Sequence, residues 1–181
     1  KKVKILEIAS NDGTFLKILK KKFNLVIGVE PAKNLAKLAN KNGNKTFNFF
    51  FNETNAKKIK DKTKTGFDLI ICRNVIPHIN NLHTVFKGIN LLLNKNGKLI
   101  VEFHYAKEIL HNMQFDYIYH EHTYYFTIKT LGNFAKLYGL YPNDAKKSKI
   151  SGGSLILTFS KSKQKSKRFQ KIFQLENKYK L

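Results

Sequence analysis

Apolar runs alternate with helical patterns along the first hundred residues of the chain. Five runs are predicted strands, at residues 4–8, 25–29, 45–50, 66–72 and 98–103. Three helices are predicted between them from apolar residues at helical spacing, after residue 13 and at 31–39 and 82–93. The run at 66–72 is almost continuously apolar, which is typical of a parallel strand covered on both faces. The alternation predicts an α/β protein with a doubly wound, mostly parallel sheet.

The pattern changes after the fifth strand. Residues 104–125 show only a short helical start, at 106–113, and a longer helix is predicted at 127–138. A strand at 154–159 with an antiparallel partner within 140–150 brings the expected sheet to seven strands.

The end of the chain, residues 160–181, is rich in lysine and carries Phe169, Phe173 and Leu175 at helical spacing. This spacing predicts an amphipathic helix whose apolar face needs a partner. We therefore expect a domain over residues 1–160 and a helical tail over 161–181.

The loop after the first strand is suited to binding an anion. Glu7 ends the apolar run, and residues 10–13 are Ser, Asn, Asp and Gly, of which Asn and Gly best tolerate positive φ. Such a loop presents backbone N–H groups, and the following helix adds the positive end of its dipole. Glu30 ends the second strand, where a carboxylate can accept both hydroxyls of a ribose. These runs predict a nucleoside-binding βαβ unit, and the alternative is an ordinary strand-to-helix turn.

Side chains after the third and fourth strands are further pocket candidates. Phe50, Phe51 and Asn52 fall where a nucleoside base would lie, although neighbouring phenylalanines are more often core residues. Arg73, Asn74 and His78 follow the fourth strand. Ligands of open α/β sheets collect beyond the carboxyl ends of the strands, so position alone makes these three residues candidates.

Composition adds a formal net charge of +22, which would suit a nucleic acid or another anionic surface. Almost all of the positive charge is lysine, with Arg73 and Arg168 the only arginines, and this looks like the bias of an AT-rich genome. Arginine is preferred for base and phosphate recognition, so a nucleic-acid partner is disfavoured. No stretch is long and apolar enough to span a membrane and no signal-peptide pattern is present, so we expect a cytoplasmic protein. The single cysteine, Cys72, is expected to be a small buried hydrophobe.

The glycine pattern distinguishes between cofactors. The dinucleotide fingerprint Gly-x-Gly-x-x-Gly is absent, whereas Glu7-x-Ala9-x-Asn11-x-Gly13 resembles the acidic-x-Gly-x-Gly-x-Gly loop of class I S-adenosylmethionine-dependent methyltransferases. The resemblance implies a seven-stranded Rossmann-like methyltransferase sheet with an antiparallel last strand, and S-adenosylmethionine as cofactor. It places the cofactor on Glu7, Ala9, Asn11, Asp12, Gly13, Glu30, Pro31, Phe51, Asn52, Arg73 and Asn74.

Six motifs along the chain are similar to those of the sugar C-methyltransferase family, in order Asn11-Asp-Gly-Thr14, Gly28-Val-Glu-Pro-Ala32, Arg73-Asn-Val75, Gln114-Phe-Asp116, Ile118-Tyr-His-Glu-His122 and Gly152-Gly-Ser-Leu155. Members of this family methylate a ring carbon of nucleotide-linked 4-keto-6-deoxysugars. The similarity extends over nearly the whole chain. It implies a nucleotide sugar, or another small molecule, as substrate.

The chemistry of that family indicates roles for the motif residues. Methylating a carbon beside a ketone requires removal of a C–H proton, and histidine suits this task because its pKa lies near working pH. Carried over by motif, His122 would be the base, and Tyr119 and Glu121 would position the sugar or orient the histidine. Substrate contacts are expected at His78, His120 and Ser151. A regular strand would separate Tyr119 from His122, so a shared site needs irregular backbone here. A metal site at His-Glu-His is the alternative, but no matching ligands accompany it, and we expect none.

Three departures from the family pattern limit the substrate assignment. His104 stands where relatives usually carry proline, Ser151 where they carry histidine, and Ile156 where they carry arginine. The family also has an amino-terminal zinc module and a carboxy-terminal α/β region, so we expect this chain to be a fragment of a longer protein. Three possibilities stay open: a nucleotide-sugar C-methyltransferase, a methyltransferase of another small molecule, and a nucleotide-binding module without turnover.

Overall fold

A computed structural model describes residues 3–149 and 152–179 of the chain. These residues form two compact units, the first made by the chain up to Cys72 together with Asn81–Leu99, and the second by Arg73–Asn80 and the chain from Ile100 onward. Seven strands form a sheet in the order β3-β2-β1-β4-β5-β7-β6. The expected α/β fold, with a mostly parallel seven-stranded sheet and an antiparallel last strand, is therefore confirmed.

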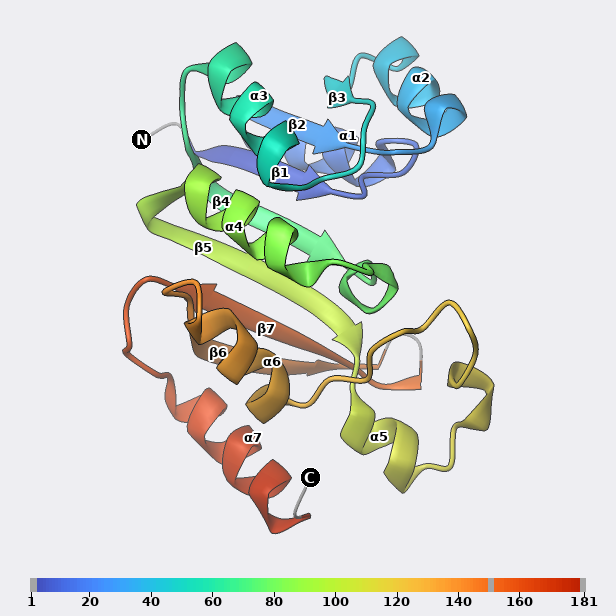
Figure 1. Ribbon diagram of the computed structural model, residues 1–181, viewed down its shortest axis with the longest axis vertical. Helices are drawn as coiled ribbons and strands as arrows, with labels where there is room; N and C mark the ends of the chain where they lie inside the picture. The colour runs from blue at the N-terminus through green and yellow to red at the C-terminus, as the bar shows by residue number, and fades with distance from the viewer. Residues whose placement is uncertain (1–2, 150–151, 180–181) are drawn as a thin grey trace. The chain divides into compact units, whose positions relative to one another are not determined.

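Strands and helices alternate through the first unit: β1 (Lys4–Ile8), α1 (Thr14–Lys20), β2 (Leu25–Val29), α2 (Lys33–Lys41), β3 (Thr46–Phe47), α3 (Glu53–Thr63), β4 (Phe67–Arg73), α4 (Leu82–Leu92) and the start of β5 (Leu93–His104). Strand β1 pairs in parallel with β2 and β4, and β2 pairs with β3. Helices α3 and α4 cover one face of these strands, and α1 lies behind them (Figure 1). Strands β1, β2 and β4 are mostly apolar because both faces are covered.

Local packing explains where this unit differs from the sequence prediction. Helix α3 was not predicted, because its polar sequence places only Ala56 and Ile59 in the core. The Asn96-Gly97 pair, a local turn signal just ahead of the strand predicted at 98–103, is instead part of β5, where a Cβ atom added to Gly97 would lie 2.9 Å from the Phe67 carbonyl oxygen of β4. Contact with a neighbouring strand thus overrides the local turn preference.

Short helices and an antiparallel hairpin make up the second unit: η1 (Ile76–His78), the end of β5, α5 (Ala106–His111), η2 (Phe115–Tyr117), α6 (Ile128–Lys136), β6 (Tyr141–Ser148), β7 (Ser154–Ser160) and α7 (Lys167–Lys178). Strands β6 and β7 are antiparallel, and α6 packs on β6 (Figure 1). Leu155, Leu157 and Phe159 alternate along β7 and are fully buried. Between α5 and α6 the chain forms an irregular loop, as expected for the segment before residue 125.

The tail helix α7 is tied into the second unit by a buried carboxylate. Glu176 is fully buried and accepts hydrogen bonds from the Tyr105 hydroxyl at 2.7 Å and from the backbone N–H groups of Ile128 at 2.7 Å and Lys129 at 2.9 Å. These N–H groups belong to the first turn of α6, where a negative charge is stabilised by the helix dipole. Phe169 on the same helix is also buried. The domain boundary expected at residue 160 stays a prediction, but the apolar face of the tail has its partner here.

Candidate active site

The loop after β1 holds three alternate residues in the left-handed region. Ala9 has φ +57°, Asn11 φ +53° and Gly13 φ +81°. These are the positions at which the resembling methyltransferase loop carries glycine. The backbone conformation explains that preference, since glycine adopts positive φ without steric cost and asparagine tolerates it. Ala9 is the one residue of the three that is neither glycine nor a residue type that tolerates this conformation, so its Cβ atom is strained there.

Glu30 fastens this loop. Its side chain is 6 % exposed, and its two carboxylate oxygens accept the backbone N–H groups of Asn11 and Ala32, each at 2.9 Å. A carboxylate offers about four lone pairs, so two acceptor positions remain for the hydroxyls of a ribose. Ser10 in the same loop has a buried hydroxyl oxygen without a hydrogen-bond partner among the described residues. A polar ligand such as the nucleoside of S-adenosylmethionine fits these groups.

The other cofactor residues predicted in the first unit differ in their burial and in their hydrogen-bond partners. Glu7 is fully buried at the end of β1, and its charge, after burial itself, raises the pKa of the Cys72 thiol. Asp12 accepts hydrogen bonds from both the backbone N–H and the hydroxyl of Thr14, which lower its pKa, so its carboxylate stabilises the start of α1. Pro31 is half-buried just before α2.

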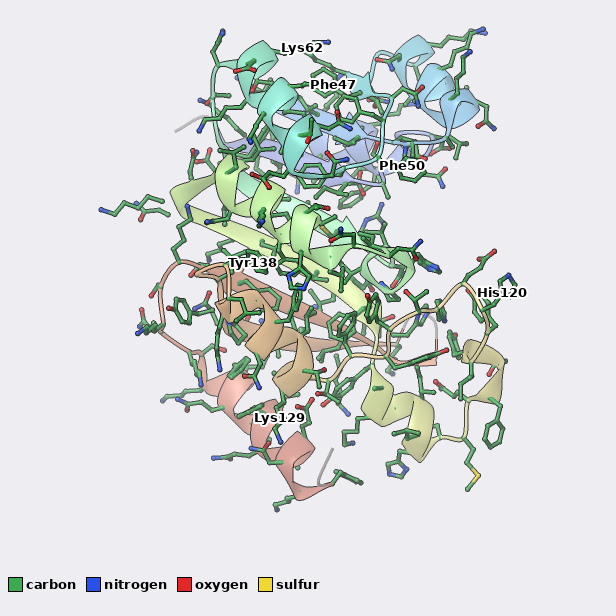
Figure 2. All side chains as sticks on the ribbon, in the orientation of Figure 1. Phe47, Phe50, Lys62, His120, Lys129 and Tyr138 are labelled. Atoms are coloured by element: carbon green, nitrogen blue, oxygen red, sulfur yellow. The ribbon has the colours of Figure 1, made fainter. Side chains whose placement is uncertain are left out.

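Two predicted base-binding residues serve the packing of α3. Phe51 is 8 % exposed, and its ring lies against Gly88, where an added Cβ atom would be 3.1 Å away. The Asn52 side chain caps α3 by accepting the backbone N–H of Asn55 at 2.8 Å. The exposed aromatic side chain in this region is Phe50, which projects from the ribbon in Figure 2. Phe51 is thus a core residue, as the alternative interpretation of these phenylalanines has it.

At the end of β4, the second unit begins with two more predicted cofactor residues. Arg73 is exposed. Asn74 has φ +51°, donates its backbone N–H to the Glu102 carbonyl oxygen at 2.8 Å, and has a buried side-chain oxygen without a partner among the described residues. A left-handed residue with an unsatisfied buried oxygen is typical of a ligand site.

The second unit gathers the predicted catalytic residues around His122, which is 6 % exposed. A turn in which His122 N–H donates to the Tyr119 carbonyl oxygen at 3.0 Å brings both side chains together, as the expected irregular backbone allows. His122 Nδ1 lies 2.8 Å from the Tyr117 carbonyl oxygen, and the Tyr119 hydroxyl lies 3.2 Å from His122 Nε2. The His78 ring is 4.7 Å from the His122 ring.

The predicted substrate residues His78 and His120 line one pocket of about 290 Å³ together with Glu121. His78 Nδ1 lies 2.9 Å from the Glu121 carbonyl oxygen, which accepts a hydrogen bond from the ring N–H, and His120 projects from the loop (Figure 2). Glu121 therefore positions His78, while the Tyr117 carbonyl oxygen orients His122. Ser151 lies outside the described residues; the neighbouring Gly152 and Gly153 line a second pocket of about 540 Å³ with Glu108 and Lys147.

Sequence reasoning missed two contributors to this cluster. His104, at the end of β5, has its ring 5.1 Å from that of His122 and 4.5 Å from that of Tyr117, and its buried Nδ1 has no partner among the described residues. Desolvation, then repulsion from His122 and His78, lowers the pKa of His104, so it favours the neutral form. Its replacement of the family's proline was the available signal. Tyr117 acts through its backbone, which no side-chain motif reveals.

Neither a metal centre nor a membrane span is found in the part of the chain that the structure describes. No three His, Cys, Asp or Glu side chains among residues 3–149 and 152–179 are grouped to hold a metal ion. Within the same residues, every helix is too short or too polar to cross a bilayer.

A family model described as a methyltransferase domain matches residues 1–143 of the chain. Among curated proteins, the C-methyltransferase NovU of Streptomyces niveus is 34% identical over 154 residues, which cover 84% of this chain and 36% of NovU. The chain thus spans little more than a third of the length of that relative.

Solved structures share the fold at low sequence identity. A methyltransferase from Thermotoga maritima superposes with a TM-score of 0.66 at 18% identity, covering 88% of this chain and 82% of its own. The magnesium protoporphyrin IX methyltransferase of Synechocystis, solved with S-adenosylhomocysteine bound, gives 0.61 at 14% identity, with coverages of 88% and 74%.

Proposed function

The chain belongs to the methyltransferase domain family, and from this membership we propose that this S-adenosylmethionine-dependent domain methylates a ring carbon beside the ketone of a nucleotide-linked 4-keto-6-deoxysugar. The similarity to a C-methyltransferase over 154 residues supports carbon as the acceptor atom. The Tyr-His-Glu-His motif and the surroundings of His122 support an acidic C–H group as the site of reaction.

S-adenosylmethionine would supply the electrophilic methyl group. The loop of residues 9–13 would hold it through backbone N–H groups, and Glu30 would accept the two ribose hydroxyls with the lone pairs that its bonds to Asn11 and Ala32 leave over. Glu7, Asp12, Gly13, Pro31, Arg73 and Asn74 are the remaining proposed contacts, whereas Phe51 and Asn52, also expected from the motifs, are engaged in the packing and capping of α3.

His122 carries the proposal, because it is a buried imidazole whose protonation site is fixed. A carbonyl oxygen only accepts hydrogen bonds, so the contact with Tyr117 places the ring proton on Nδ1 and leaves the lone pair on Nε2. A histidine in this tautomer is a suitable proton acceptor for a carbon acid.

The sugar would meet the pocket formed by His78, His120 and Glu121. Imidazole and carboxylate groups around about 290 Å³ suit the hydroxyls of a sugar ring. Ser151 is a further proposed contact from the motif alone. All of these proposed contacts lie within this chain, which matches 36% of the length of NovU.

Two measurements on the same protein test it. Calorimetric titration with S-adenosylhomocysteine should give binding that is lost or strongly weakened in Glu30→Gln and unchanged in Glu53→Gln, whose carboxylate is on the exposed side of α3. Nuclear magnetic resonance should then detect deuterium entering the carbon beside the ketone of a nucleotide-linked 4-keto-6-deoxyglucose in heavy water, and this exchange should disappear in His122→Asn. If the folded wild-type protein does not bind S-adenosylhomocysteine, the proposed methyltransferase activity is refuted. If it binds S-adenosylhomocysteine but exchanges deuterium into no keto sugar, the substrate is a small molecule of another class.

A further inference from the structure

The lone pair of His122 is covered by another residue. The Tyr119 hydroxyl lies 3.2 Å from Nε2, and because that nitrogen carries no proton, the phenol must donate to it. The two rings are 4.2 Å apart between centroids. In this arrangement no substrate atom can occupy the direction in which His122 would accept a proton.

Exposure differs sharply between the two partners. The Tyr119 side chain is 41 % exposed, whereas His122 is 6 % exposed. The rings of His78, His104 and Tyr125 also surround His122, at 4.7, 5.1 and 6.3 Å between centroids. A molecule arriving from solvent would therefore meet Tyr119 before it reaches His122.

We propose that Tyr119 is the residue that takes the proton from the substrate, with His122 as the base behind it; this inference rests on the proposed carbon methylation. As the C–H bond breaks, its electron pair forms the enolate and its proton bonds to the Tyr119 oxygen. The original Tyr119 proton moves at the same time to His122 Nε2. The products are a neutral tyrosine, an imidazolium and an enolate.

The charges in this step are accommodated by groups already in place. The imidazolium keeps its Nδ1–H bond to the Tyr117 carbonyl oxygen, and this bond is strengthened when the ring becomes charged. The concerted transfer moves both protons in one step and so avoids a separate phenolate intermediate. After methyl transfer the reverse shift releases the proton to water through Tyr119 and restores the neutral pair.

Deuterium exchange on the keto sugar distinguishes this relay from direct attack by His122. If the two residues act as one unit, Tyr119→Phe and His122→Asn should each slow exchange by about 10²-fold or more, and the double variant should be no slower than either single variant. Tyr124→Phe is the matched control, since Tyr124 is 36 % exposed in the same loop and its hydroxyl donates to the Asn80 carbonyl oxygen. Exchange in Tyr119→Phe within a few-fold of wild type would overturn the relay. Retained S-adenosylhomocysteine binding confirms that each variant is folded.

A second measurement needs no substrate. In ¹⁵N spectra of the histidine rings, His122 Nε2 should show the shift of an unprotonated, hydrogen-bonded nitrogen, and should move toward that of an unbonded nitrogen in Tyr119→Phe but not in Tyr124→Phe. If the chemical shift of His122 Nε2 is the same in Tyr119→Phe as in wild type, the inference is overturned. A wild-type protein that shows this signal but exchanges no keto sugar would refute the proposed function while leaving the Tyr119–His122 contact established.

Discussion

Replacing Ala9 by glycine should stabilise the protein, although the same change in most folded segments is destabilising. Ala9 has φ +57°, and an L-residue in this region costs about 1–2 kcal/mol relative to a right-handed conformation. Glycine removes that cost but adds about 0.4–1 kcal/mol of chain entropy to the unfolded state. The difference predicts a gain of between about 0 and 1.6 kcal/mol in the free energy of unfolding, with about 0.8 kcal/mol at the middle of both ranges.

Urea unfolding monitored by circular dichroism measures this gain as a higher transition midpoint at unchanged slope. Ala36→Gly is the matched control, because Ala36 is buried within α2 at an ordinary helical conformation. There the same substitution should lower the free energy of unfolding by about 1 kcal/mol through helix propensity and by a further ~0.8 kcal/mol for the lost methyl group. A destabilised Ala9→Gly variant would show that the left-handed conformation at residue 9 is wrong.

Further predictions concern buried contacts and pH. Gly28→Ala should lower the free energy of unfolding by about 1–3 kcal/mol, because the new methyl carbon would lie 2.3 Å from Ser10 Oγ, and adding Ser10→Ala should restore part of it in the same urea assay. Glu176→Ala should cost about 3 kcal/mol or more, since it leaves two buried donors and one part-buried donor unpaired, whereas Glu53→Ala, which removes an exposed pair with Lys57, should cost less than about 0.5 kcal/mol. Hydrogen bonds from Arg168 hold the pKa of Asp144 below its usual 3.8, so the carboxylate stabilises the fold above that pH, and the advantage of wild type over Asp144→Asn should shrink as pH falls below about 4. An advantage that stays constant down to pH 2 would contradict the shift.

Strand and helix positions in the first unit follow from local sequence. The runs at β1, β2 and β4 are mostly apolar because both faces of these strands are covered, and such runs are recognisable without tertiary contacts. Asn11 and Gly13 also indicated a left-handed loop from the sequence alone, because tolerance of positive φ is a property of the residue itself. Helix α3 was missed because its polar surface carries little periodic signal.

Motif order in the sequence determined the family, the cofactor and the residues His122, Tyr119 and Glu121 as candidates for the chemistry. Which atom faces which was decided only by the tertiary structure. Three groups around His122 come from different elements. The Tyr117 carbonyl oxygen, at the end of η2, fixes the tautomer of His122, and the Tyr119 hydroxyl, in the following loop, covers its lone pair. The ring of His104 comes from the end of β5. A hydrogen bond requires its donor and acceptor to lie about 3 Å apart. The spacing of these residues along the sequence does not determine such distances. They are set only when the loop folds against the end of β5.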